Sequence, residues 1–446
     1  MKKIKLLILA LTATLAACKR DNFNELKPVA ITIDIAFDAT AKPYNFPVKN
    51  SKIILTNLTN GNIVEGKTDE NGTLNLTSVS PGNYDIEATL SISPADYFIA
   101  TGTMPEVDVV FNAVLKSQSV IQEKNHLSLE LKAGKLGDWI IKQIYYAGSH
   151  TSNGAMFRDQ FIEVYNNSNE VLYADSLCFS QVFGTNTKLT AIDMTKGYYQ
   201  VTTKQFDWTK SIGMIDSKAN TDYVYAKSLF MIPGTGTEHP VQPGNSIVIA
   251  ATALNHKSPF TGADGKTISV KDPSLTIDLS NADFEVYLGN YPGVNPLASD
   301  VDNPAVTNLT VLSRGGNRDL IMEATGRDAY VVFKAPSNVA NWAKYPAPDE
   351  TVIGTSTDLY TQIPIKYISD GVEIETPLDA NRLPKKLGAA LDAGAVFVSK
   401  GQYSSQSLIR KTAKTINGRN VLSDSNNSKN DFAELNIPDV TKTVFK

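Results

Sequence analysis

Cysteine and histidine are scarce in this 446-residue chain, which contains two Cys and four His. Two Cys exclude a disulfide scaffold. The four His (His126, His150, His239 and His256) show no His-x-His or His-x-x-x-His spacing for zinc, and are read as exposed loop residues. A net charge of −4 offers no basic surface for nucleic acid, so no such partner is predicted. Gly-x-Ser-x-Gly, P-loop and zincin motifs are all absent, and the sequence predicts no cofactor.

Long apolar runs are also missing after the first 17 residues, so no later segment reaches the roughly 18 residues of a membrane-spanning helix. The composition is 42% apolar and 20% charged, which is typical of a globular protein. A chain of this length is expected to form two or three domains.

The N-terminus has the pattern of a targeting segment. Three lysines within the first five residues precede the apolar run 6–15, and Leu15-Ala16-Ala17-Cys18 resembles the lipobox of bacterial lipoproteins. This resemblance implies that residues 1–17 are a signal peptide, that Cys18 is acylated, and that 18–28 is a lipidated tether. The alternative is an ordinary signal peptide with an incidental Cys18. The predicted location is the outer membrane, through a lipid anchor, with the periplasmic and extracellular faces both left open.

Residues 29–133 alternate between apolar and polar side chains, as half-buried strands do. Thr68-Asp69-Glu70-Asn71-Gly72 precedes one strand and Pro81-Gly82-Asn83-Tyr84 precedes another. This pattern resembles the carboxypeptidase-regulatory-like or collagen-binding-B-like family, which implies an Ig-like or prealbumin-like β-sandwich. In such a fold the tight turn needs Gly72, and the Tyr84 hydroxyl bonds to local backbone.

Residues 138–446 follow a linker at 134–137 and are read as a larger β domain. The segment 158–168, with Phe-Ile-Glu-Val-Tyr-Asn at its centre, and the Pro-Gly turns near 233 and 243 resemble the lamin-tail family. That family needs about a hundred residues, so we predict an elaborated Ig-like sandwich with long insertions at about 178–228 and 290–400. Short helices are expected only at 338–344 and 384–392.

The lipobox, the first sandwich and the 300-residue region together resemble an outer-membrane lipoprotein family of Bacteroidota, domain of unknown function 4876. This resemblance covers essentially the whole mature chain and implies little chemistry. Genes of such lipoproteins often neighbour TonB-dependent receptors, which makes such a receptor a candidate partner.

Three groups of polar residues are weak candidates for chemistry. Asp424, Asn426 and Asp431 lie in an oxygen-rich stretch that calcium could bind, although a polar turn held by Asx hydrogen bonds is the preferred interpretation. Asp159 and Glu163, four residues apart, fall on one face of a strand and are a candidate acid–base pair. Asp175-Ser176-Leu177 resembles the Bacteroidota O-glycosylation acceptor, with Ser176 as the modified residue.

Aromatic residues gather in the first predicted insertion, and we select Tyr198, Tyr199, Trp208 and Tyr223 as a candidate binding surface. The other interpretation is that they cover the sandwich core. Cys178, between Leu177 and Phe179, is read as a small buried hydrophobe.

The sequence leaves three functions open. The preferred one is a non-catalytic outer-membrane lipoprotein that binds a glycan or nutrient, or accompanies a TonB-dependent transporter. The second is a secreted or surface hydrolase with carboxylates on the inserted loops. The third is a structural or adhesion protein of the envelope.

Overall fold

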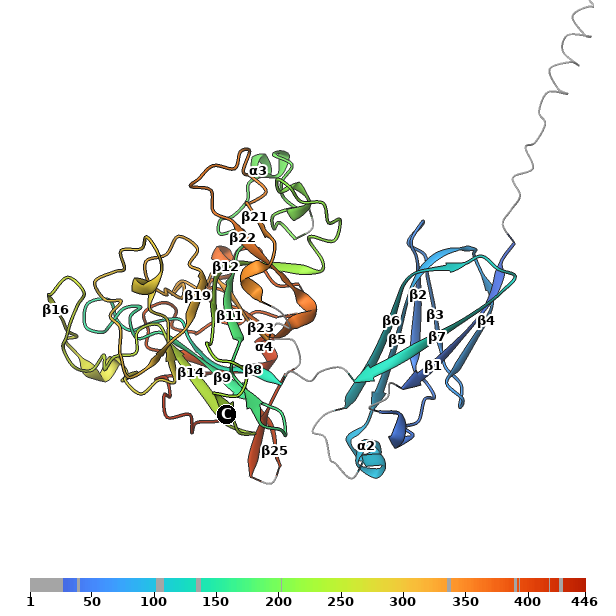
Figure 1. The fold of residues 1–446 in the computed structure, drawn as a ribbon, viewed down its shortest axis with the longest axis horizontal. Coiled ribbons are helices and arrows are strands. Elements are labelled where there is room, and N and C mark those ends of the chain that lie inside the picture. Colours follow the sequence, from blue (N-terminus) through green and yellow to red (C-terminus); the bar gives the residue numbers. More distant parts are fainter. Residues whose placement is uncertain are drawn as a thin grey trace, which may run out of the picture. The chain divides into compact units, whose positions relative to one another are not determined.

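The computed structural model describes residues 27–446 except 38–40, 102–107, 134–137, 202, 335–337, 389–390, 393, 417 and 425–427. The predicted signal peptide and Cys18 lie outside this range, as does most of the tether. The described chain is mostly β, and it divides into two compact units, Met1–Gly134 and Lys135–Lys446 (Figure 1). None of the described helices is long and apolar enough to cross a membrane.

Unit 1 is a seven-stranded β-structure with the strand order β3-β2-β5-β6-β7-β1-β4. Its elements are β1 (Val29–Phe37), η1 (Lys42–Tyr44), β2 (Lys52–Asn57), β3 (Ile63–Lys67), β4 (Thr73–Val79), β5 (Gly82–Ile92), α2 (Pro94–Thr101), β6 (Val109–Val120) and β7 (Lys124–Ala133). Every second side chain of β1, from Val29 to Phe37, is buried, so its alternating sequence places one face on the core.

Two turns of unit 1 carry the residues that the family resemblance singled out. Gly72 has φ +80°, and a Cβ there would lie 3.1 Å from both Ile35 and Val48, so glycine is required. The Tyr84 hydroxyl donates to the carbonyl oxygen of Ser80 at 2.7 Å, and the ring is buried. Both expectations are confirmed.

Unit 2 contains two seven-stranded sheets. The first sheet has the order β18-β17-β14-β9-β8-β24-β27, and the second has the order β21-β22-β12-β11-β20-β23, with β19 also paired to β12. The strands of the first sheet are β8 (Trp139–Tyr145), β9 (Phe161–Asn166), β14 (Ser246–Ala250), β17 (Phe284–Glu285), β18 (Thr307–Asn308), β24 (Ser407–Arg410) and β27 (Phe432–Leu435). Those of the second are β11 (Leu177–Val182), β12 (Tyr223–Met231), β19 (Thr310–Ser313), β20 (Ala329–Lys334), β21 (Lys344–Tyr345), β22 (Tyr360–Pro364) and β23 (Ile368–Glu373).

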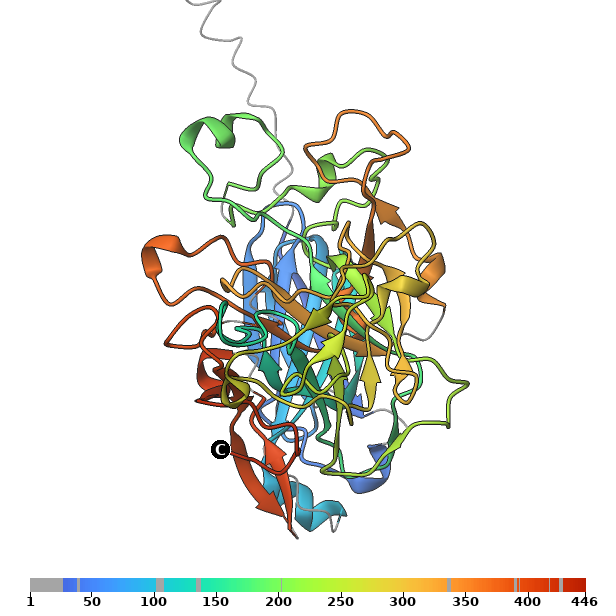
Figure 2. The same ribbon diagram turned by 90° about the vertical axis from the view of Figure 1, so that its left-hand side faces the viewer.

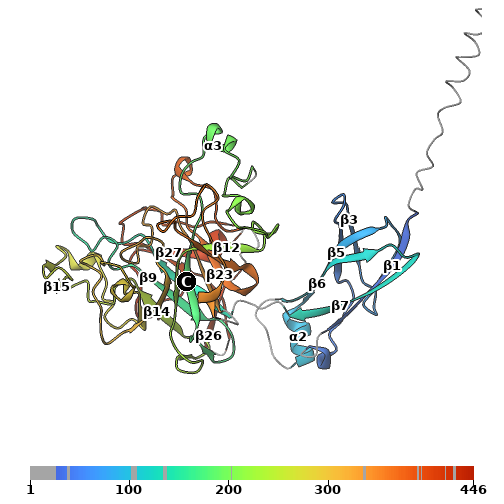
Figure 3. The same ribbon diagram turned by 45° about the horizontal axis from the view of Figure 1, so that its top comes forward.

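Short elements complete unit 2 around these sheets. They are β10 (Leu172–Tyr173), β13 (Pro240–Val241), β15 (Phe260–Thr261), β16 (Thr267–Ile268), β25 (Thr412–Ile416), β26 (Arg419–Leu422), α3 (Ala191–Thr195), α4 (Ser428–Asp431), η2 (Trp208–Lys210), η3 (Pro273–Leu275), η4 (Leu288–Asn290), η5 (Val339–Asn341), η6 (Ile365–Tyr367) and η7 (Asp379–Asn381). The loop with β15 projects from the unit well apart from α3 (Figure 3).

The main core of unit 2 joins the two sheets. Ile144 and Ile162 of the first sheet share one buried cluster with Phe179, Phe230 and Val332 of the second. The prediction of a β-sandwich is therefore correct. Cys178 is fully buried beside this layer, as expected.

The predicted insertions at 178–228 and 290–400 are part of the sandwich itself. The first range contains β11 and the start of β12, and the second contains β19 to β23, so the two ranges supply almost the whole second sheet. They are not insertions outside the sandwich. Because strand pairing is non-local, the short lamin-tail pattern could not reveal which later segments complete the second layer.

The two predicted helices are also wrong in the described residues. Asn338 caps only the single turn η5, after which the chain extends into β21 to pair with β22. In the segment 384–392, the backbone N–H groups of Lys386 and Leu387 instead donate to the buried Glu373 carboxylate at 2.9 and 2.8 Å. Tertiary partners override local propensity at both places.

Candidate functional site

One end of the second sheet of unit 2 carries a groove. The strands β11, β12 and β22 are consecutive antiparallel neighbours, so the end of β11, the start of β12 and the end of β22 meet there. The green segment with α3 and the orange segment with β21 and β22 gather at this end of the unit (Figures 1 and 2). Loops at one end of a sandwich are a common position for binding sites, because a rigid scaffold holds them.

The groove has a volume of about 710 Å³, within the range of small-molecule sites. Three aromatic rings, one carboxylate, one ammonium and two amides are among the side chains that line it. The lining residues are Thr221, Asp222, Tyr223, Asn341, Trp342, Ala343, Gln362, Pro364, Ile365, Lys366 and Tyr367.

A row of stacked rings forms one wall of the groove. The Trp342 ring stacks on buried Phe333, with centroids 5.6 Å apart and an interplanar angle of 19°. Trp342 also stacks with Tyr367 at 5.8 Å and 27°, and the Lys366 ammonium lies 5.0 Å from the Tyr367 centroid. This packing fixes the orientation of Trp342, which remains partly exposed.

The opposite wall begins with β12. The carbonyl oxygen of Asp222 accepts the backbone N–H of Ile365 at 2.9 Å, which joins the two walls at the base. A hydrogen bond to Asp216 and burial raise the pKa of Tyr223. Because the hydroxyl donates its proton to Asp216, its oxygen remains to accept a hydrogen bond. Gln362 is buried below and donates to the Tyr225 hydroxyl at 3.1 Å, which leaves its amide oxygen as an acceptor.

Of the aromatic residues selected from the sequence, only Tyr223 lines the groove. Trp208 is buried and stacks on Tyr225 at 3.4 Å, while Tyr198 and Tyr199 pack against the same cluster. The covering interpretation therefore applies to these three residues.

Sequence reasoning missed Trp342, Tyr367 and Lys366. The segment around Trp342 was expected to be a helix, which would not have presented its ring in this row. A usable signal was the concentration of Trp342, Tyr345, Tyr360 and Tyr367 in the second predicted insertion, which parallels the first.

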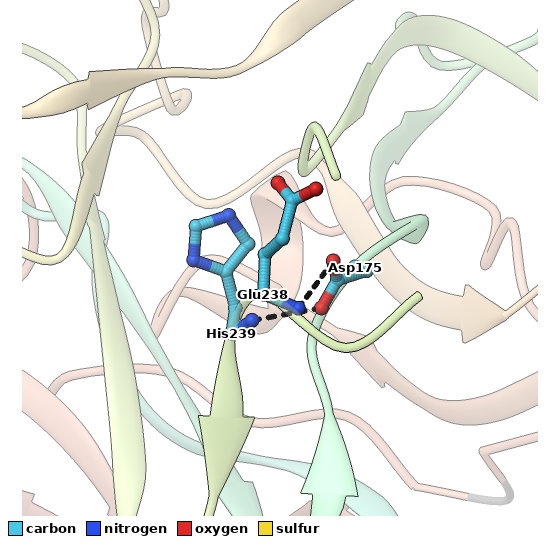
Figure 4. A group of neighbouring side chains, drawn as sticks. All are labelled: Asp175, Glu238 and His239. Atoms are coloured by element: carbon cyan, nitrogen blue, oxygen red, sulfur yellow. Dashed lines mark hydrogen bonds between the residues drawn. The ribbon is translucent and has the colours of Figure 1, made fainter. Parts of the chain in front are cut away.

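Asp175, Glu238 and His239 form the one group in the described residues whose side-chain atoms are close enough to share a metal ion (Figure 4). The buried Asp175 carboxylate accepts three backbone N–H groups, from Gly236 at 3.1 Å, Glu238 at 3.0 Å and His239 at 2.9 Å. Burial opposes ionisation, but these donors lower the pKa of Asp175 to about 2.

The carboxylate thus works as a clamp on the loop 234–239. The Glu238 side chain extends away from these bonds, and its carboxylate accepts the Thr235 hydroxyl at 2.7 Å (Figure 4). Three N–H dipoles already point at Asp175, which makes its surroundings favourable for an anion and unfavourable for a metal cation. Ser176 follows with φ +62° and is partly exposed, so the proposed glycosylation at this residue stays a prediction.

The calcium candidates face a cation that the chain itself supplies. Buried Arg410 lies 3.7 Å from Asp424 and 3.6 Å from Asp431, and it forms a tight ion pair with Asp370. Asn426 is outside the described residues. The guanidinium explains why these carboxylates converge, without calcium.

Asp159 and Glu163 do not form a pair. Asp159 precedes β9 and accepts the Tyr145 hydroxyl at 3.3 Å, whereas Glu163 lies on the strand and pairs with buried Lys142 at 3.0 Å. The expectation that all four histidines lie on exposed loops is wrong for His256, which is buried, and for His126, which lies on β7.

Comparison with known proteins gives the family. The model for "protein of unknown function (DUF4876)" matches residues 242–439, a range that includes Trp342, Gln362 and Tyr367 of the groove. Residues 242–439 belong to the DUF4876 family. A search among curated proteins gives no match.

A solved structure supports the same fold. The crystal structure of a DUF4876 family protein from Bacteroides thetaiotaomicron is 22% identical, covers 91% of this chain and 95% of its own, and has a TM-score of 0.50. This likeness concerns the fold alone. A DUF3823 family protein from Bacteroides uniformis is 11% identical over 75% of this chain and 96% of its own, and its TM-score of 0.16 carries no argument.

Proposed function

We propose that this DUF4876 protein is a non-catalytic binding protein that holds a neutral oligosaccharide in the groove at Trp342. The observation that carries the proposal is the partly exposed Trp342 ring, held by stacking with Phe333 and Tyr367 beside amide and hydroxyl groups. The apolar face of a sugar ring packs against aromatic surface that is left exposed in this way. Its hydroxyls both donate and accept hydrogen bonds, which matches Asn341, Gln362 and Tyr223.

The lining of the groove supports binding rather than hydrolysis. Asp222 is its one carboxylate, while glycoside hydrolysis uses two carboxyl groups about 5 to 9.5 Å apart. We therefore place the hydrolase alternative second.

The cellular setting belongs to the same proposal. We propose an outer-membrane lipoprotein that is anchored through acylated Cys18, and the lipobox supports this anchor. We also propose that it acts beside a TonB-dependent receptor, because genes of the lipoprotein family that it resembles often neighbour such receptors. Labelling with a palmitate analogue tests the anchor: wild type should be labelled, and Cys18→Ser should not. A mild-detergent pull-down from native membranes tests the receptor, and a clean, partnerless protein would contradict that part.

Binding is tested by calorimetric titration of residues 28–446 with tetrasaccharides of cellulose, xylan, starch and mannan. We expect one of them to bind, and Trp342→Ala to weaken it about tenfold or more, as loss of an aromatic anchor does. Trp208→Phe, in the aromatic cluster outside the groove, is the matched control and should bind as wild type. Equal binding by wild type and Trp342→Ala would overturn the proposal.

A further inference from the structure

A second hollow opens in unit 2, with a volume of about 840 Å³. Its lining comes from five segments: the residue after β8, the loop after β11, the loop before β20, the loop after β23 and the loop before β24. These residues are Tyr146, Asn186, Thr187, Lys188, Ala324, Thr325, Arg327, Thr376, Pro377, Leu378, Asn381, Leu383, Ser399, Lys400, Gly401 and Gln402.

Strand register explains why these segments meet. In the second sheet Gln181 pairs with Tyr330 and Ala329 pairs with Glu373, so the end of β11, the start of β20 and the end of β23 share one edge. In the first sheet Leu408 pairs with Ile144, which likewise brings the start of β24 beside the end of β8. Both layers of the sandwich therefore build this hollow.

The charge of the lining has one sign. Lys188, Arg327 and Lys400 contribute three cations, and none of the lining residues is acidic, although the whole chain carries a net charge of −4. Arg327 pairs with Glu323 at 3.1 Å. The ammonium groups of Lys188 and Lys400 are exposed and have no ion-pair partner among the described residues.

The nearest carboxylates are already engaged. Glu323 also accepts the Thr325 hydroxyl at 2.8 Å. Glu434, behind Ser399, accepts the Ser399 backbone N–H, the Ser399 hydroxyl and the Gln406 amide at 3.0, 2.7 and 3.0 Å. Glu375 and Asp379, which flank the lining residues of the loop after β23, pair with Arg382 at 3.0 and 2.8 Å. None of these four acids lines the hollow, so the positive potential of the two lysines is not cancelled inside it.

Polar side chains without partners accompany the cations. Asn186, Thr187, Asn381 and Gln402 line the hollow, are exposed, and make no side-chain hydrogen bond within the described structure. Amides and hydroxyls offer both donors and acceptors, which suits a ligand rich in hydroxyl groups. The Leu378 side chain, 63% exposed, adds an apolar surface beside them.

From these features we infer that the hollow between the β11, β20, β23 and β24 loops binds an acidic oligosaccharide, whose carboxylate or sulfate groups pair with Lys188, Lys400 and Arg327. This site is separate from the groove at Trp342, so it goes beyond the proposed function. Long-range attraction by exposed lysines is screened by salt, and the affinity should fall as ionic strength rises.

The test uses residues 28–446 and two charged probes, tetragalacturonate for carboxylate and the κ-carrageenan tetrasaccharide for sulfate. We expect calorimetry at 50 mM NaCl to detect binding of at least one probe, and fully methyl-esterified tetragalacturonate to bind at least about fivefold more weakly than the free acid if the carboxylate is the recognised group. The tighter probe assigns the anionic group.

Variants locate the site. The double variant Lys188→Gln/Lys400→Gln should weaken the charged probe about fivefold or more, while Lys257→Gln, an exposed lysine outside the hollow, should leave affinity unchanged. Because both lysines are exposed and have no ion-pair partner in the part of the chain that the structure describes, the double variant is expected to keep the wild-type melting temperature.

Three results would overturn the inference. They are no binding of either probe, a loss of affinity in Lys257→Gln as large as in the double variant, or equal affinity for a hexaglutamate peptide, which lacks the sugar hydroxyls. Trp342→Ala separates this site from the groove. It should weaken neutral-sugar binding about tenfold or more and leave the affinity for the charged probe unchanged, so either proposed site can fail without the other.

Discussion

At the scale of single residues, burial gives His256 a lowered pKa that the sequence could not reveal. Its Nε2 lies 3.0 Å from the Thr252 carbonyl oxygen, and its Nδ1 has no hydrogen-bond partner in the described structure. Burial, and to a smaller extent the charge of Arg158, lower the pKa of His256 from 6.5 to about 4, against the opposing effects of the Thr252 hydrogen bond and of Asp278.

This pKa predicts an acid sensitivity. The unfolded state takes up a proton on His256 near pH 6.5 and the folded state only near pH 4, so stability is lost as the pH falls through that window. Between pH 7 and pH 5 the folded state should lose about 2 kcal/mol through this group. Urea unfolding at both pH values should show a smaller loss for His256→Asn than for wild type. Equal losses would contradict the assignment.

Glu163 is a second residue whose surroundings the sequence could not reveal. The spacing from Asp159 to Glu163 is visible in the sequence, but the partner of Glu163 is Lys142, which is fully buried and also donates to the Lys442 carbonyl oxygen at 2.8 Å. A lysine inside an apolar strand gives no sign of its partner 21 residues away. Local pattern identified the strand, and only tertiary packing assigned the pair.

At the scale of elements, the Asp175 clamp ties the turn before β11 to the loop before β13. Gly234 has φ +131°, and a Cβ there would lie 2.1 Å from the Asp175 carboxylate. Only glycine therefore allows the loop to approach the carboxylate this closely. The short β10–β13 pair, Leu172 with Val241 and Tyr173 with Pro240, lies directly beside it.

If the Asp175 carboxylate is a clamp and not a metal ligand, removing it should lower the free energy of unfolding, and a chelator should have no effect. Asp175→Asn replaces one accepting oxygen by a donor that faces N–H groups, and we expect a loss of about 2–3 kcal/mol in urea unfolding. Glu238→Gln changes an exposed member of the same cluster and should cost less than about 0.5 kcal/mol. If EDTA destabilised the wild type, or if both variants behaved alike, a metal site would explain the cluster better than a clamp.

Element prediction succeeded where the pattern was local. The alternation of β1, the positive φ of Gly72 and the Tyr84 hydrogen bond to Ser80 were predictable, because each depends on local conformation; the close approach of Ile35 and Val48 to Gly72 was not. The second sheet of unit 2 was not, since β11, β12, β20, β22 and β23 come from distant segments whose pairing has no sequence signature. The groove could not be predicted either, because it depends on the same strand pairing.

At the scale of the whole molecule, each unit has its own buried core, one in residues 29–131 and several in 139–432. Separate cores predict that each unit folds alone. The fragments 28–133 and 138–446 should each unfold cooperatively, with midpoints within about 3 °C of the two transitions of the 28–446 chain. A fragment that is unfolded in isolation by circular dichroism would contradict this division.

We propose that the groove at Trp342 binds a neutral oligosaccharide, and the three tryptophans of the chain can report on such binding. Trp139 is buried in the sandwich and Trp208 under the Tyr225 ring, whereas Trp342 lines the groove. The most direct measurement is a titration of ¹⁵N-labelled 28–446 with the cellulose, xylan, starch and mannan tetrasaccharides, following the three indole N–H signals. We expect one sugar to shift the Trp342 signal, assigned from Trp342→Phe, and to leave the signals of Trp139 and Trp208 in place. No shift with any sugar, or equal shifts of all three signals, would contradict it.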